Sequence, residues 1–97
     1  MYSFSSKKEV IIFEKEGDLY MLDAIIVGKV IHDCREKKGL SQEVVSGLAD
    51  IGRTHLSAIE RGVRKPTLDT FFKISEAMNI APSELMKLIE IELSNHC

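Results

Sequence analysis

Five side chains within one short segment could contact the edges of nucleic-acid bases. If the segment is an α-helix, 100° per residue places them in a single arc of about 140°: Arg53, Thr54, Ser57, Ala58 and Arg61. These side chains are short or basic, and none is acidic. Arginine can donate two hydrogen bonds to guanine in the major groove. A helix with this face can therefore enter the major groove with its N-terminal end against the bases.

The segment is locally basic although the whole chain is acidic. The formal net charge is −2 at pH 7, but residues 51–65 carry four basic side chains against Glu60 alone. For nucleic-acid binding, the position of the charges matters more than their sum. Arg61, Arg64 and Lys65 could hold phosphates, or they could be an ordinary solvated surface. Tryptophan is absent and aromatic residues make up 6% of the chain, which disfavours stacking on single-stranded bases.

Neither a metal site nor a catalytic site is expected. His32 and Cys34 are two residues apart in a predicted helix and so face apart, while His96 and Cys97 end the chain. There is no glycine-rich phosphate loop, and serine, histidine and aspartate are scattered at spacings that do not converge. We therefore expect a protein that is not an enzyme and that needs no metal ion or other cofactor.

Cysteine usage and hydropathy indicate the cellular compartment. Two cysteines are too few for a disulfide framework, which favours the reducing cytoplasm. No apolar run approaches the ~20 residues that a helix needs to cross a bilayer. These features predict a cytoplasmic protein that does not bind a membrane.

The elements that must position the basic segment are helices. Apolar residues at helical spacing predict five of them between Asp23 and the C-terminus. In chain order their apolar faces are Ala24, Val27, Ile31 and Cys34; Val45, Leu48 and Ala49; Leu56 and Ile59; Leu68, Phe71, Phe72, Ser75 and Met78; and Leu85, Leu88, Ile89 and Leu93. The pattern predicts a compact all-α bundle over residues 23–97, with Cys34 as a small core residue.

Start and stop signals separate the predicted helices. Gly39 ends the first helix, and Ser41 is a good N-cap for a second helix that begins at Gln42. The other signals are Asp50-Ile51-Gly52 between the second and third helices, Gly62 after the third, Thr67 and Asn79 at the two ends of the fourth, and Pro82 in the first turn of the fifth.

Residues 1–22 follow a different pattern and form an N-terminal extension. Two apolar runs flank Glu16-Gly17-Asp18, which favours a short β-hairpin that would have to pack on the bundle or on a second subunit. Alternatively, these three residues can be encoded by the purine-rich string GAG-GGA-GAT, which is typical of a bacterial ribosome-binding site. Met21 would then be the native start, and residues 1–20 would be a translated leader.

Two short helices joined by a tight turn are typical of the helix-turn-helix motif. Residues 27–89 resemble the phage repressor/Cro-type helix-turn-helix domain, the XRE-like family of lambda repressor. The motifs that carry the resemblance are Val27-Gly28, Ile31, Arg35, Gly39-Leu40-Ser41-Gln42-Glu43, the ten residues from Arg53 to Gly62, and Pro66-Thr67-Leu68. The chain departs from the family pattern at Ser46, Asp50 and Gly52, where the family usually has alanine, glycine and a serine-type cap.

The resemblance implies a five-helix, lambda-repressor-like fold and a transcriptional regulator that binds double-stranded DNA sequence-specifically, as a homodimer on a palindromic operator. It also implies the residues that contact DNA, which are Ser41, Gln42, Arg53, Thr54, His55, Ser57, Ala58, Arg61, Arg64 and Lys65. Among them, Gln42 could instead serve only in capping, and His55 could instead pack on the flank of its helix. The likeness further implies a partly buried ion pair between Arg35 and Glu60.

Two alternatives remain open at the level of assembly and function. The apolar arc of the last helix could lie entirely in the core, or its edge at Met86 and Leu93 could meet a second copy of the chain. The competing function is a protein-interaction module, such as an antitoxin or anti-regulator, that binds a partner protein through the same fold.

Overall fold

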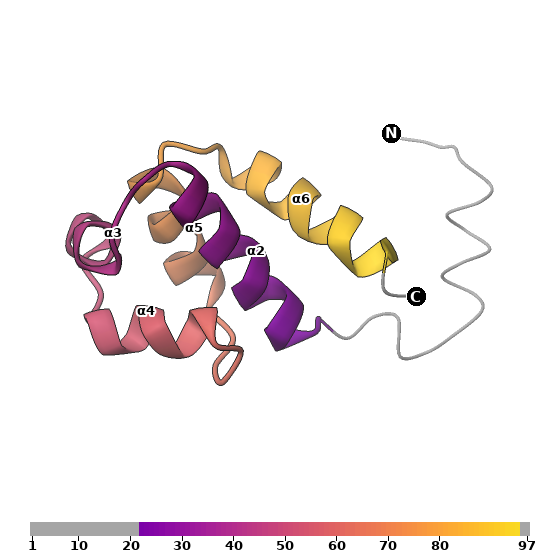
Figure 1. Ribbon diagram of the computed structural model, residues 1–97, viewed down its shortest axis with the longest axis horizontal. Helices are drawn as coiled ribbons and strands as arrows, with labels where there is room; N and C mark the ends of the chain where they lie inside the picture. The colour runs from indigo at the N-terminus through magenta and orange to yellow at the C-terminus, as the bar shows by residue number, and fades with distance from the viewer. Residues whose placement is uncertain (1–21, 96–97) are drawn as a thin grey trace.

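Five helices make up the part of the chain that the computed structural model describes, residues 22–95 (Figure 1). They are α2 (Ala24–Lys37), α3 (Gln42–Ala49), α4 (Arg53–Glu60), α5 (Leu68–Ala77) and α6 (Pro82–Asn95). No strand occurs among the described residues. The hypotheses of an N-terminal β-hairpin and of a translated leader concern residues 1–21, which lie outside the described residues, as do His96 and Cys97.

The predicted caps Ser41 and Thr67 and the predicted stops are confirmed, and Asp23, which was not predicted as a cap, also caps a helix. The side chains of Asp23, Ser41 and Thr67 each accept a hydrogen bond from a backbone N–H in the first turn of α2, α3 and α5. Such bonds satisfy donors that have no acceptor within the helix. The chain leaves four helices through left-handed residues, which are Gly39 (φ 70°), Asp50 (φ 58°), Gly62 (φ 78°) and Asn79 (φ 59°).

The core lies between the helices and contains side chains from all of them. Its fully buried members with the largest side chains include Ile31, Leu56, Ile59, Ile74, Met78, Leu85 and Ile89. Cys34 is a half-buried free thiol packed against this core, and burial raises its pKa. The predicted apolar faces of α2 and α4 therefore point inward.

Four residues that we placed on apolar faces are exposed instead. Leu48 is 68% exposed, Leu68 69% and Phe72 47%, whereas Ile74, which the face of α5 had omitted, is fully buried. Leu88 of α6 is also exposed. Each lies at the margin of its helix face, where helical periodicity predicts a direction but does not show whether another element covers the side chain.

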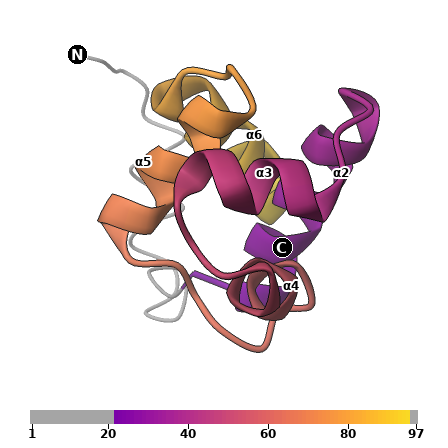
Figure 2. The ribbon, with the colours of Figure 1, turned by 90° about the vertical axis from the view of Figure 1, so that its left-hand side faces the viewer.

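The helices are arranged so that α4 lies at one edge of the bundle. It packs against α2 and α3, while α5 packs against α3 and α6, and α6 packs against α2. Figure 1 shows α4 along one edge, and Figure 2 shows it nearly end-on below α3. None of the other described helices packs on the side of α4 that faces away from α2 and α3.

Candidate nucleic-acid interface

The turn between α3 and α4 is tight and well bonded. Asp50 adopts the left-handed conformation (φ 58°), and its backbone N–H donates to the Gly47 carbonyl at 3.2 Å. The next N–H, of Ile51, donates to the Ser46 carbonyl at 3.0 Å. Aspartate tolerates this conformation better than most residues, so the substitution of the family's usual glycine keeps the turn.

Gly28 allows α4 to lie directly against α2. A Cβ atom at this position would stand 2.7 Å from the backbone oxygen of Glu60 and 2.9 Å from its carbonyl carbon. Real Cβ atoms do not approach backbone so closely, so only glycine fits between the two helices. The close contact fixes the C-terminal half of α4 on the bundle.

A buried ion pair joins the same two helices. Arg35 Nε donates to Glu60 Oε2 at 2.7 Å and Arg35 Nη2 donates to Glu60 Oε1 at 2.9 Å, with side-chain exposures of only 8% and 3%. The hydrogen bonds that Arg35 donates to Glu60 hold the pKa of Arg35 above its usual value. The predicted Arg35–Glu60 bridge is thus confirmed, and the one acidic side chain of residues 51–65 is neutralised by a partner.

Four of the five predicted arc residues lie on the outward side of α4. Arg53, Thr54 and Arg61 are exposed and Ser57 is half-buried. Arg61 Nε donates to Ser57 Oγ at 3.4 Å, which keeps this arginine alongside the helix. Because Gly52 has no side chain to cap the helix, the first N–H groups of α4 also remain available to an anion such as phosphate.

Ala58 is the least exposed of the five arc residues. Its residue exposure is only 9%. The backbone N–H groups of Val63 and Arg64 both donate to the Ala58 carbonyl, at 2.9 and 3.4 Å. These two bonds close the end of α4 through the Ala58 backbone, and the DNA contact of the Ala58 side chain stays a prediction.

The remaining predicted contacts surround α4. Arg64 and Lys65 are exposed in the loop that follows it, and His55 is half-buried on its flank. Ser41 is exposed, and its Oγ accepts the Val44 N–H at 3.0 Å, so it is the N-cap of α3.

Gln42 makes a contact that we did not predict from the sequence. It is half-buried, and its Nε2 donates to Glu60 Oε1 at 3.0 Å. The two residues are 18 positions apart, and no local pattern links them.

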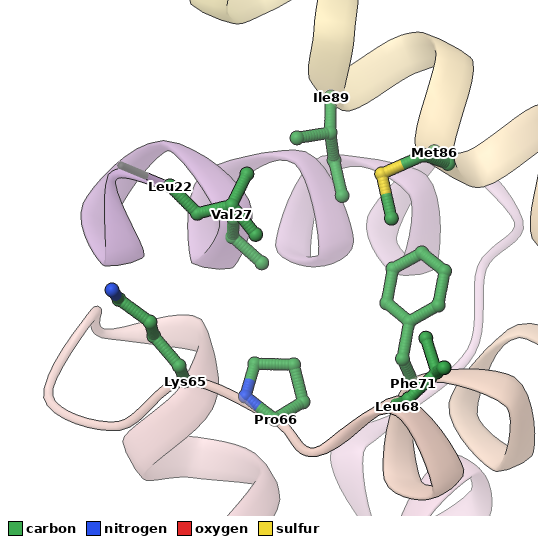
Figure 3. Close-up of a pocket in the computed structure, with 8 residues that line it drawn as sticks. All are labelled: Leu22, Val27, Lys65, Pro66, Leu68, Phe71, Met86 and Ile89. Atoms are coloured by element: carbon green, nitrogen blue, oxygen red, sulfur yellow. The ribbon is translucent and has the colours of Figure 1, made fainter. Parts of the chain in front are cut away.

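An apolar groove lies beside the loop that carries Arg64 and Lys65. It has a volume of about 210 Å³, and its lining is Leu22, Val27, Lys65, Pro66, Leu68, Phe71, Met86 and Ile89. Figure 3 shows the Met86 side chain extending from α6 toward the ring of Phe71. Of the two residues predicted at the edge of α6, Met86 lines this groove, whereas Leu93 packs against the core.

Two further kinds of site are absent from residues 22–95. No group of three or more histidine, cysteine, aspartate or glutamate side chains could hold a metal ion there. None of the helices in this range is long and apolar enough to span a bilayer.

Comparisons with known proteins agree with this geometry. The chain is 35% identical over 68 residues to the control protein C.BamHI of Bacillus amyloliquefaciens, an alignment that covers 69% of this chain and 84% of that protein. The restriction-modification controller protein C.AhdI of Aeromonas hydrophila is 34% identical, with a TM-score of 0.63 over 67% of this chain and 98% of that one. A variant of the controller protein C.Esp1396I is 25% identical, with a TM-score of 0.73 over 79% of this chain and all of that one.

The family model that matches is the helix-turn-helix model HTH_3, over residues 31–85. This range extends from the middle of α2 through α3, α4 and α5 to the start of α6. It contains both members of the Arg35–Glu60 pair and every predicted DNA-contact residue. The chain therefore belongs to the HTH_3 helix-turn-helix family of XRE/Cro/C1-type DNA-binding transcriptional regulators, which are not enzymes.

Proposed function

We propose that this regulator acts in the cytoplasm by occupying a palindromic operator as a homodimer, with α4 of each copy in the major groove. The observation that carries the proposal is the uncovered start of α4, where Arg53 and Thr54 are exposed on a helix that is held firmly by Gly28 and by the Arg35–Glu60 pair. These contacts support base recognition, because side chains of α4 can read the bases only if the helix does not shift.

Within this proposal, base contacts and phosphate contacts are made by different residues. Arg53 and Thr54 read base edges from the first turn of α4, and Ser57 follows one turn later. Arg61, Arg64 and Lys65 hold phosphates, together with Gln42 and Ser41 at the start of α3. His55 flanks this surface and contacts the backbone. Phosphate contacts supply affinity that depends on salt and is independent of sequence.

The apolar groove supports the homodimer. Leu68 is 69% exposed at its rim, and Lys65 and Pro66 join the groove to the loop that follows α4. A second copy docked there would cover exposed apolar surface and bring the two α4 helices to one side of the dimer. A two-fold dimer of this kind suits half-sites about one turn of DNA apart.

The relatives suggest the kind of regulation. C.BamHI is a control protein, and C.Esp1396I is known as a tetramer in complex with its natural 35-base-pair operator. By similarity, we infer that this chain is a controller or repressor that changes transcription by occupying a promoter region.

Selection of bound sites from random duplex DNA tests the proposal. We expect a palindrome with half-sites about one helical turn apart. Enrichment of a single half-site would contradict the homodimer, and failure to enrich any sequence would contradict sequence-specific DNA binding.

One observation favours a protein partner as a second candidate function. Leu48 is 68% exposed on α3 and borders a hollow that Lys73, Glu76 and Ala77 of α5 also line. A salt series separates the two functions, because affinity for DNA falls steeply as salt rises. An affinity for duplex DNA that is weak and independent of sequence at all salt concentrations would favour the protein-interaction module.

A further inference from the structure

One hydrogen bond links the buried ion pair to the start of α3. Glu60 Oε1 accepts from Arg35 Nη2 at 2.9 Å and from Gln42 Nε2 at 3.0 Å. The same carboxylate therefore binds a side chain of α2 and a side chain of α3, while it belongs to α4 itself. Gln42 is the half-buried outer member of this set and the first residue of its helix.

The chemistry of the partners fixes the orientation of the Gln42 amide. Both oxygens of the Glu60 carboxylate accept hydrogen bonds from the Arg35 guanidinium group, and a carboxylate in such a pair acts as an acceptor. The amide must therefore turn its nitrogen toward Glu60. One N–H of Nε2 is used in this bond, and the second N–H and the Oε1 of Gln42 remain for another partner.

Arg35 prevents Glu60 from turning away from this position. Its Nε and Nη2 hold both carboxylate oxygens, and its Nη1 donates to the Leu40 carbonyl at 2.8 Å. Leu40 immediately precedes the N-cap Ser41. The guanidinium group thus holds the carboxylate and the chain just before α3 at the same time.

We propose that Glu60 is a positioning residue for DNA binding, because it fixes the Gln42 amide before DNA arrives. The inference rests on the proposed function, in which Gln42 contacts the DNA backbone. A glutamine side chain that is free in solution loses rotamer freedom when it binds, and a side chain already held loses less. Glu60 itself is buried and is not expected to touch DNA.

The first test uses the protein without DNA. Gln42 is the only glutamine in the chain, so its side-chain amide gives one identifiable pair of NMR signals. We expect the heteronuclear ¹⁵N NOE of this group to match that of the α3 backbone and to exceed that of the exposed Asn95. A Gln42 amide as mobile as that of Asn95 would overturn the proposal, whether or not the protein binds DNA.

The second test is a double-mutant cycle in operator affinity. Glu60→Asp keeps the charge that Arg35 needs but is shorter by one methylene group, which withdraws the acceptor from Gln42. We expect Gln42→Ala to weaken binding about tenfold in the unaltered protein and less than about twofold in the Glu60→Asp background. Thr54→Ala is the matched control, since Thr54 lies six residues from Glu60 along α4, about 9 Å, and should cost the same in both backgrounds.

The outcomes separate a positioning role from a structural one. If Glu60 only stabilises the fold, Gln42→Ala costs the same factor in both backgrounds, and the proposal is wrong. A specific operator that binds the unaltered protein and Gln42→Ala equally well also overturns it and removes the Gln42 contact, while the proposed reading of the operator by α4 still stands. Should Glu60→Asp fail to fold, Arg35→Lys replaces it, because lysine cannot hold both carboxylate oxygens in a bidentate pair.

Discussion

Replacing Arg35 with methionine should strongly destabilise the fold. The substitution would leave the Glu60 carboxylate buried, with its side chain 3% exposed and Gln42 as its remaining side-chain donor, and it would remove the donor to the Leu40 carbonyl. Loss of one partner of a buried ion pair costs ~3–5 kcal/mol. A domain of this kind has a total stability of about 5–15 kcal/mol, so the variant should unfold at a much lower denaturant concentration.

Urea unfolding followed by circular dichroism measures this effect. The matched control is Lys29→Met, which makes a lysine-to-methionine replacement in the same helix and breaks the exposed Lys29–Asp33 pair, whose side chains are 54% and 56% exposed. Exposed pairs of this spacing contribute little to stability, so this control should unfold at nearly the same urea concentration as the unaltered protein.

The double substitution of Arg35→Met with Glu60→Leu tests the cause. It removes both charges together, so it should recover most of the lost free energy of unfolding. If Arg35→Met costs no more than Lys29→Met, the buried pair does not hold α2 and α4 together as described.

Three further predictions concern the exposed surface of α4 and the contacts that hold α4 on the bundle. Arg53→Ala should weaken operator binding by ~1–3 kcal/mol, as measured by fluorescence anisotropy, and should relax specificity at one base position, as measured by repeated site selection. Unchanged specificity would show that Arg53 does not contact a base. Arg64→Ala and Lys65→Ala should each lower the slope of log affinity against log salt by about 1 and weaken all sequences equally, and an unchanged slope would show that neither residue holds a phosphate. Gly28→Ala should lower the free energy of unfolding by ~1–3 kcal/mol, because a methyl group would press on the Glu60 backbone oxygen 2.7 Å away. The control Gly47→Ala, where a Cβ would have nothing within 4 Å, should leave the stability unchanged or raise it. Equal effects of the two substitutions in urea unfolding would contradict the close contact of α2 and α4.

Most of the fold could be predicted because the chain signals its helix ends locally. Ser41 and Thr67 cap helices through their own side chains, and Gly39 and Asn79 take up left-handed conformations that few residues accept. These signals depend on the residue itself and its near neighbours, so they can be read without knowledge of the tertiary structure.

The exposure of particular side chains could not be predicted in the same way. Leu48 and Ala58 both lie at helical spacings that suggested the opposite environment. Leu48 is exposed because no described element covers it, and Ala58 is only 9% exposed although it lies in the predicted outward arc. Both outcomes depend on long-range packing, which periodicity does not contain.

The candidate site also contains contacts that could be predicted from the sequence and one contact that could not. The basic arc of α4 and the Arg35–Glu60 pair followed from helical geometry and from the family resemblance. The bond between Gln42 and Glu60 joins two helices across 18 residues and could be found only in the structure. It changes the interpretation of Gln42 from an exposed contact to a side chain already held in place.

The central claim is that the start of α4 enters the major groove. The most direct test is to titrate ¹⁵N-labelled protein with the selected operator duplex and to map the backbone amide shifts along the chain. We predict that the largest changes fall on residues 53–57 of α4 and on Gln42, with smaller changes in the loop at Arg64 and Lys65. Changes confined to α5 and α6, with the α4 amides unaffected by a duplex that binds specifically, would contradict the claim.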